Sequence, residues 1–224
     1  MMEQLRDREQ AGCLLAKKLA RYANRPDVLV LGLPRGGVPL AYVIARALGA
    51  SLDILIVRKL GVPGYKEFAI GAVSVGGARF INPDVVEEFH LSQDEVEKVV
   101  STELGRMARL DSAYRASRPP LDVRGRTTIL VDDDIVTGST MRAAIEALKR
   151  LGSARVVVAV GVVPLSIYLL LGPEAEEVVS LMTPREVRAV GQFYKSFPQV
   201  TDAEVRSLLH RSMAQGARGA AAAS

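Results

Sequence analysis

The chain contains few of the residue types that build disulfide-linked or metal-bound folds. Its 224 residues include one cysteine, two histidines and no tryptophan, and aromatic residues make up 5%. A single cysteine, Cys13, excludes an internal disulfide framework, and the absence of a Cys/His cluster excludes a structural zinc site. A hydrophobic core must therefore hold the fold together, and a hydrophobic content of 49% is enough to build one.

Long apolar runs and basic runs are also missing. No apolar run reaches the roughly 18 residues of a membrane-spanning helix, and residues 1–10 are too highly charged for the hydrophobic part of a signal peptide. The net charge is +4 without any run of five Lys or Arg residues, which argues against a nucleic-acid-binding stripe. We therefore expect a cytoplasmic protein without membrane contact, whose modest positive charge attracts anionic ligands.

Short apolar segments alternate with amphipathic segments along much of the chain. The expected strands are 27–33, 52–57, 127–132 and 154–163, and the expected helices are 3–22, 38–48 and 139–151. Alternation of strand and helix on this scale predicts an α/β fold with a parallel sheet.

Two regions depart from this alternation. Residues 61–120 combine a Gly-rich loop with a long helix, so we expect an insertion or lid there. Beyond residue 163 the pattern changes again. We therefore expect a core over 1–163, a small C-terminal subdomain over 164–214 and a disordered Ala/Gly-rich tail over 215–224.

The most informative segment is 129–140, which reads ILVDDDIVTGST. A buried strand runs into three carboxylates, and a tight turn then begins an amphipathic helix. The residues concerned are Asp132, Asp133, Asp134, Val136, Thr137, Gly138, Ser139 and Thr140. Backbone N–H groups at the start of the helix, together with three hydroxyls, form a cradle for a phosphate. Carboxylates beside such a cradle suit a ligand with both a phosphate and hydroxyls or a metal ion, such as a phosphorylated sugar.

This segment resembles the signature of the type I phosphoribosyltransferases, in which an acidic pair and two apolar residues precede a Thr-Gly-x-Thr turn. The resemblance implies a phosphoribosyltransferase-like, Rossmann-like α/β fold: a mainly parallel five-stranded sheet, flanking helices and a C-terminal hood. It also implies transfer of the 5-phosphoribosyl group from phosphoribosyl pyrophosphate (PRPP) to a nitrogenous, heterocyclic acceptor, with Mg²⁺ and release of pyrophosphate. A homodimer is compatible with the resemblance.

The resemblance assigns roles within the same segment. Asp132 and Asp133 would bind the ribose hydroxyls and, mostly through water or those hydroxyls, Mg²⁺. The turn at 137–140 would bind the 5′-phosphate, and Asp134 and Val136 would lie beside the donor. Asp134 departs from the family pattern, which usually has an apolar residue there. Enzymes that act on 6-oxopurines have Asp at the place of Val136, so a 6-oxopurine is not the expected acceptor.

A second loop, Arg35-Gly36-Gly37, follows the first expected strand. Two glycines allow the backbone to approach a ligand closely, and the Arg35 guanidinium suits phosphate oxygens. Taken alone, these residues are explained better by a simple helix-entry turn. In the phosphoribosyltransferases, a loop at this place binds pyrophosphate, often through a cis peptide bond.

A third group of cations follows the second expected strand. Arg58 and Lys59 lie at its end, and Lys66 follows in the Gly-rich loop. They resemble the cations of the catalytic loop in orotate-type enzymes, where a lysine reaches the pyrophosphate. The resemblance therefore gives Arg58 and Lys59 a catalytic role and Lys66 a role in binding PRPP, with the loop at 61–67 closing as a lid.

The acceptor site is predicted from the aromatic residues Phe193 and Tyr194 in the C-terminal segment. A planar heterocycle would stack on such rings, and we expect the Tyr194 ring to be exposed because its hydroxyl can stay in water. The alternative is that both rings pack the C-terminal segment onto the core.

Two other functions fit parts of the pattern. One is a regulator of RNA or DNA that binds nucleotides or PRPP. The other is a haloacid-dehalogenase-like phosphatase, in which Asp132 would be the nucleophile. That class needs a further acidic pair at a strand end, and no adjacent Asp pair follows residue 140.

Overall fold

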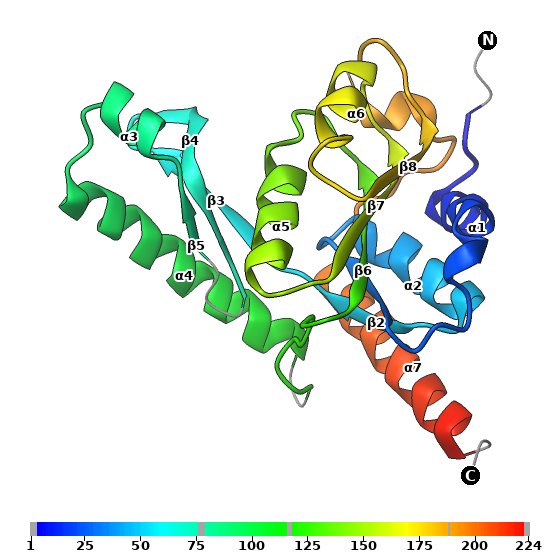
Figure 1. Ribbon diagram of the computed structural model, residues 1–224. Helices are drawn as coiled ribbons and strands as arrows, with labels where there is room; N and C mark the ends of the chain where they lie inside the picture. Colours follow the sequence, from blue (N-terminus) through cyan, green and yellow to red (C-terminus); the bar gives the residue numbers. More distant parts are fainter. Residues whose placement is uncertain (1–3, 76–78, 116–117, 188, 222–224) are drawn as a thin grey trace.

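A computed structural model of the chain describes residues 4–75, 79–115, 118–187 and 189–221, and it consists of a body and a projecting arm (Figure 1). The body contains a five-stranded sheet with helices on both faces. The arm contains a smaller sheet and a long helix (Figure 1).

The central sheet has the strand order β2-β1-β6-β7-β8, and all its strand pairs are parallel. Its strands are β1 (Val28–Gly32), β2 (Ser51–Ile54), β6 (Thr127–Asp134), β7 (Arg155–Val162) and β8 (Glu177–Met182). The inner strands are almost continuously buried, because helices cover both faces. The predicted fold class is confirmed.

The fifth strand comes from the segment that we expected to be a separate hood. β8 pairs in parallel with β7, from Val157 opposite Glu177 to Val162 opposite Met182. The boundary at residue 163 stays a prediction, but the segment 164–214 contributes the fifth strand of the central sheet. The composition of the segment cannot reveal this pairing, because the pairing depends on the edge that β7 offers.

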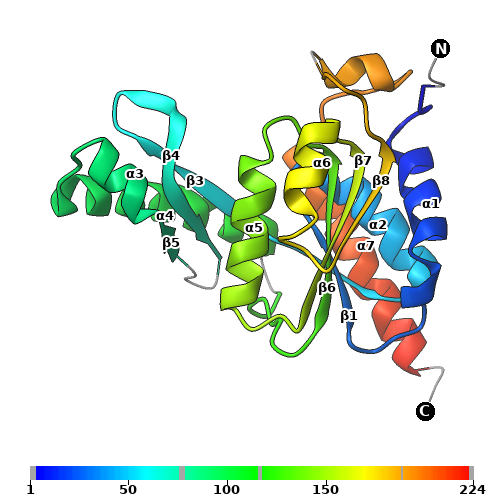
Figure 2. The same cartoon turned by 45° about the horizontal axis from the view of Figure 1, so that its top comes forward.

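Helices cover the two faces of the sheet unequally (Figure 2). One core cluster joins the sheet to α1 (Arg8–Lys18), α2 (Gly37–Leu48) and α7 (Asp202–Ala221), and a second joins it to α5 (Ser139–Arg150) and α6 (Leu165–Leu171). Single turns of 3-10 helix lie at Ala20–Tyr22 and Val190–Phe193. Within the described residues, no helix is both long and apolar enough to cross a membrane.

Two features of these helices bear on the sequence analysis. In the segment expected to be a disordered tail, α7 continues as far as Ala221, because alanine favours helix strongly; residues 222–224 lie outside the described residues. The single cysteine, Cys13, is exposed on α1.

The arm is the insertion expected at 61–120, but it begins earlier and contains more strand. It consists of the antiparallel strands β3 (Val57–Val62), β4 (Tyr65–Ser74) and β5 (Arg79–Ile81), followed by α3 (Pro83–Glu88) and α4 (Gln93–Arg115). Two buried contacts attach the end of α4 to the body, because the Arg115 guanidinium donates to Asp53 Oδ2 at 3.0 Å and to the Ile54 carbonyl at 3.2 Å.

Candidate functional site

The three aspartates at the end of β6 point to alternate faces of the sheet. Val131 belongs to the core cluster of α1 and α2, and Leu130 belongs to the cluster of α5. Since side chains alternate along a strand, Asp133 lies on the α1 side, whereas Asp132 and Asp134 lie on the α5 side. The acidic pair predicted from the sequence is therefore divided between two faces.

Asp133 is closed off by an ion pair that the sequence did not indicate. Its side chain is 6% exposed, and Oδ2 accepts a hydrogen bond from Arg8 Nε at 2.7 Å. Arg8 also donates to the Pro198 carbonyl at 2.6 Å, and its guanidinium lies 3.7 Å from the centre of the Phe197 ring. Arg8 is 125 residues away from Asp133 in the chain, so no local pattern could have found this pair.

Asp132 and Asp134 are half-buried, and neither forms an ion pair with any described residue. Burial, together with the negative charges of Asp133 and Asp134, raises the pKa of Asp132 well above its ordinary value. Burial and the charge of Asp133 raise the pKa of Asp134 to about 7. Within the described part of the chain, no cation therefore contacts either carboxylate, although the charge of Arg8 acts on Asp134.

The turn after β6 has the expected form. Gly138 has a φ of +75°, and its missing side chain leaves room for Ile167 of α6. The Thr137 hydroxyl lies 3.5 Å from Ser139 N and 3.3 Å from the Ser139 hydroxyl, at the first turn of α5. Thr137 and Thr140 are exposed, and Val136 is 47% exposed. The hydroxyls and the start of α5 thus face solvent beside Asp132 and Asp134.

The loop at 35–37 packs closely against β6. The peptide bond between Pro34 and Arg35 is cis, as the resemblance implied. A Cβ at Gly36 would overlap the Asp133 carboxylate, and a Cβ at Gly37 would overlap the Val131 carbonyl. Both glycines are thus required by the approach to β6, in addition to any approach to a ligand. The Arg35 guanidinium is half-exposed and lies 3.7 Å from Asp202 Oδ1.

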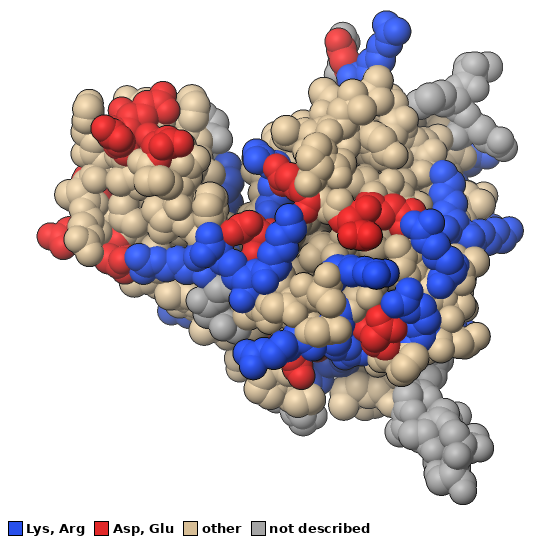
Figure 3. All heavy atoms as spheres, in the orientation of Figure 1, with Lys and Arg blue, Asp and Glu red and all other residues tan. Residues whose placement is uncertain are grey.

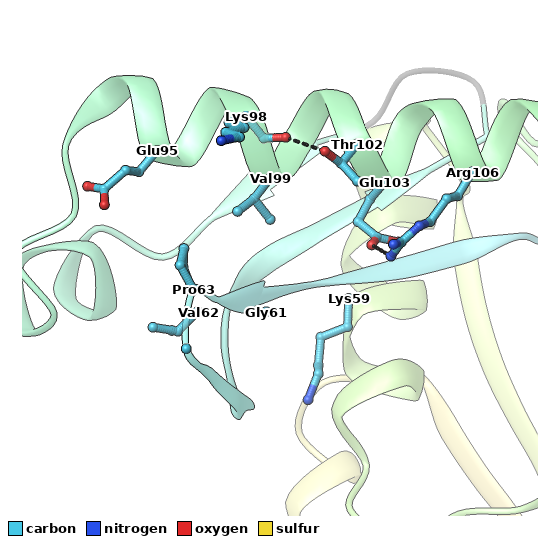
Figure 4. A pocket seen from close by; sticks show the side chains of 11 residues that line it. Lys59, Gly61, Val62, Pro63, Glu95, Lys98, Val99, Thr102, Glu103 and Arg106 are labelled. Carbon is cyan, nitrogen blue, oxygen red and sulfur yellow. Dashed lines mark hydrogen bonds and ion pairs between the residues drawn. The ribbon is translucent and has the colours of Figure 1, made fainter.

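The cations of the third group belong to the arm. They lie on β3 and β4 of the arm, not at the end of β2. Arg58 donates to Glu103 Oε2 of α4 at 2.8 Å, and Arg106 binds the same carboxylate in the groove between β3 and α4 (Figure 4).

Lys59 also lines that groove, but its side chain extends from β3 on the side away from α4 (Figure 4). It lines a cavity of about 500 Å³ together with Ser139 and Arg142 of α5. Lys59 is therefore the predicted cation that lies next to the 137–140 turn. The side chain of Lys66 lies outside the described residues.

The exposed position predicted for Tyr194 is wrong. Tyr194 is 3% exposed and Phe193 is also buried, because 193–195 pairs with the backbone of Leu5. The Tyr194 hydroxyl donates to the Asp133 carbonyl at 2.9 Å, and its ring stacks on Phe197 at a centroid distance of 4.7 Å. Neither ring offers a face to an acceptor, so the structure gives no support to the predicted acceptor site.

Charges of both signs are interleaved over the visible face of the body, without a single basic stripe (Figure 3). Acidic side chains gather at the end of the arm, where Asp84, Glu87 and Glu88 of α3 are exposed (Figure 3).

A parallel five-stranded sheet, with carboxylates and a hydroxyl turn after its central strand, defines a phosphoribosyltransferase-type domain. Comparison with known families agrees, because residues 1–168 match the phosphoribosyl transferase domain. The chain belongs to this family. The phosphatase alternative for Asp132 is therefore wrong.

Similar proteins extend this assignment. The chain is 43% identical over 220 residues to a "Putative phosphoribosyl transferase" of Mycobacterium tuberculosis, a match covering 96% of the chain and 49% of the relative. The chain thus spans about half the length of the curated relatives that it matches. It is 33% identical over 129 residues to the bifunctional protein PyrR of Corynebacterium diphtheriae, covering 56% of the chain and 47% of PyrR.

Among solved structures, the chain is similar to the crystal structure of TT1426 from Thermus thermophilus. The TM-score is 0.85 at 40% sequence identity, and the match covers 93% of the chain and 99% of TT1426. The similarity therefore includes both the central sheet and most of the arm.

Proposed function

We propose that this chain binds PRPP together with Mg²⁺ and transfers its 5-phosphoribosyl group to a nitrogenous, heterocyclic acceptor, releasing pyrophosphate. One observation carries the proposal. The carboxylates that end β6 lie directly before the hydroxyl turn at the start of α5, in a chain of the phosphoribosyl transferase family. Acids that can accept hydrogen bonds from hydroxyls, next to a cradle for a phosphate, match the two ends of a ribose 5-phosphate group.

The 137–140 turn would bind the 5′-phosphate. Backbone N–H groups in the first turn of α5 point toward the ligand, and the helix dipole favours a negative charge there. The hydroxyls of Thr137, Ser139 and Thr140 supply further donors. A carboxylate of β6 would accept hydrogen bonds from the ribose hydroxyls, and its negative charge would stabilise the positive charge that develops on the sugar as pyrophosphate leaves.

The donor set fits Mg²⁺. Asp132 and Asp134 supply oxygen ligands only, which this hard cation prefers, and they have no competing cation among the described residues. No described group of three or more His, Cys, Asp or Glu residues could hold a metal ion alone, which suits an ion bound mainly by donor oxygens and water. When bound, Mg²⁺ would neutralise charge on the pyrophosphate.

Two cations would bind the pyrophosphate end of the donor. Arg35 is half-exposed in the loop beside β6, and Lys59 reaches the cavity next to Ser139. Val136 would offer the acceptor an apolar contact, since its side chain is exposed beside the site and cannot transfer a proton.

Isothermal titration calorimetry with PRPP, with and without Mg²⁺, tests this proposal. We expect Mg²⁺-dependent binding in the micromolar range, on the order of −8 kcal/mol, and weaker binding of both PRPP and ribose 5-phosphate by Thr137→Ala. Thr102→Ala, on the exposed face of α4, is the matched control. No PRPP binding at saturating Mg²⁺ would refute the proposal. Pyrophosphate release on adding an acceptor would separate a transferase from a regulator that binds the donor without turnover.

A further inference from the structure

Exposed apolar side chains gather in two places on this chain. Among the described residues, eight large apolar side chains are exposed, and five of them lie either at the end of the arm or on α6. Single exposed apolar side chains are common on protein surfaces, whereas a group of them marks an interaction surface. The proposed function uses neither group.

The first group is an aromatic patch at the end of the arm, formed by Tyr65, Phe68 and Phe89 and called the arm patch below. Tyr65 is 53% exposed and Phe68 is 49% exposed. Both rings pack on Phe89, at centroid distances of 5.5 and 5.2 Å. Phe89 directly follows α3, so the exposed acidic side chains of α3 lie beside the rings (Figure 3). The arm patch therefore combines apolar rings with negative charge.

The end of the arm and the rest of the chain have opposite net charges. Residues 65–98 contain three Lys or Arg and seven Asp or Glu, which gives a net charge of −4. The remaining residues contain 26 Lys or Arg and 18 Asp or Glu, which gives +8. The arm patch of one copy is therefore attracted to the body of another copy and repelled by the arm patch of another copy.

The second group lies on the outer side of α6, whose residues 165–171 read LSIYLLL. The inner side of this helix packs on the core cluster that it shares with α5. The outer side exposes three leucines, called the α6 patch below: Leu165, Leu169, which is 64% exposed, and Leu170. A helix that is apolar all round is normally buried all round. The surface over α6 is mostly uncharged (Figure 3), so this side of the helix lacks a cover among the described residues.

The two patches of one copy do not meet. Figures 1 and 2 both show the end of the arm standing apart from α6. Two-fold symmetry would bring the patches of two copies together, because the arm patch of each copy would then cover the α6 patch of the other. Contact between like patches would leave the other pair uncovered. Specific interfaces bury at least about 1,000 Å² in total, which favours the reciprocal contact because it uses four patches.

We propose that this chain forms a two-fold dimer in which the arm patch of each copy packs on the α6 patch of the other. The aromatic rings and the leucine side chains supply the apolar area. The opposite charges of the arm end and the body favour this pairing over contact between two arms. The dimer needs no ligand, so its test is independent of the proposed function.

Sedimentation velocity of the full chain over a range of concentrations tests for the dimer. We expect dimerisation in the micromolar range, and a loss of affinity of at least about tenfold in Phe68→Ser and in Leu169→Ser, because each substitution occurs in both contacts of the dimer. Met213→Ser is the matched control, since Met213 is exposed on α7 and belongs to neither patch. Its dissociation constant should stay within about twofold of wild type. Circular dichroism spectra equal to that of wild type would show that each variant is folded.

The acids of α3 test the charge argument. The triple variant Asp84→Lys, Glu87→Lys and Glu88→Lys should weaken the dimer several-fold at low salt and less at high salt, because it removes the negative charge that faces the partner's body. An unchanged or tighter dimer at low salt would overturn the pairing of arm with body.

Cross-linking identifies which patches meet. The background is Cys13→Ser, because Cys13 is the only native thiol. Chains with Phe68→Cys are mixed with differently tagged chains with Leu169→Cys and treated with a short bis-maleimide. We expect a product that contains one chain of each kind.

Three outcomes would overturn the proposal. One is a cross-linked product of two Phe68→Cys chains or of two Leu169→Cys chains, since like patches would then meet. Another is a wild-type chain that stays monomeric far above micromolar concentrations. The third is a dimer that Phe68→Ser and Leu169→Ser weaken no more than Met213→Ser does.

Discussion

Replacing Tyr194 should reveal how strongly the C-terminal segment stabilises the end of β6. The ring is 3% exposed and stacks on Phe197, and its hydroxyl donates to the buried Asp133 carbonyl at 2.9 Å. Burial raises the pKa of this hydroxyl, so it stays protonated and keeps donating throughout the accessible pH range.

The size of the effect follows from these contacts. Tyr194→Phe keeps the ring but leaves the Asp133 carbonyl without its donor, which should cost about 1–3 kcal/mol of unfolding free energy. Tyr194→Ala also removes a buried aromatic ring, for about 3–5 kcal/mol in total. A chain of this length loses roughly 2–4 °C of melting temperature per kcal/mol, so the two variants should be clearly separated from wild type and from each other.

Urea unfolding followed by far-ultraviolet circular dichroism is the suitable assay, because the chain has no tryptophan. Tyr65→Phe is the matched control: Tyr65 is 53% exposed, so losing its hydroxyl should change stability by less than about 0.5 kcal/mol. Equal midpoints for Tyr194→Phe and Tyr65→Phe would refute the burial argument. Unchanged stability of Tyr194→Ala together with lost acceptor binding would restore the acceptor role that the sequence suggested for this ring.

Three further predictions concern the same end of the sheet. Gly36→Ala should lower the melting temperature by several degrees in thermal unfolding, because its Cβ overlaps the Asp133 carboxylate; an unchanged value would mean that the 35–37 loop can shift freely. The pKa of Asp134 is raised from 3.8 to about 7 in the folded chain, so the folded state binds more protons. Wild-type stability relative to Asp134→Asn should therefore fall as the pH rises from 3.8 through 7 in urea titrations, and parallel profiles would contradict this. In calorimetry, Arg35→Ala and Lys59→Ala should weaken the binding of PRPP but not that of ribose 5-phosphate, since each removes a cation from the pyrophosphate end of the site. An equal loss of affinity for both ligands would show that these residues do not bind the pyrophosphate.

Much of the fold and the centre of the site could be predicted from the sequence, because the signals are local. The segment at 129–140 contains a buried strand, its acids and the hydroxyl turn within consecutive residues, and the strand and helix begin where the pattern indicates. The parallel sheet followed from continuous apolar strands alternating with amphipathic helices. The 35–37 loop was likewise marked by its glycines and its arginine.

The tertiary structure decided everything that depends on residues far apart in the chain. The Arg8–Asp133 ion pair joins residues 125 positions apart, and the Tyr194–Asp133 hydrogen bond joins residues 61 apart. Strand alternation indicates that the side chains of Asp133 and Asp134 face opposite sides of the sheet. Only the packing of α1 shows that Asp133 is the one that forms an ion pair, with Arg8. The same applies to β8, which became the fifth strand because β7 offered it an edge for parallel pairing. Local sequence specifies which groups are present, whereas burial and counter-charge from distant elements determine which of them remain free to bind a ligand.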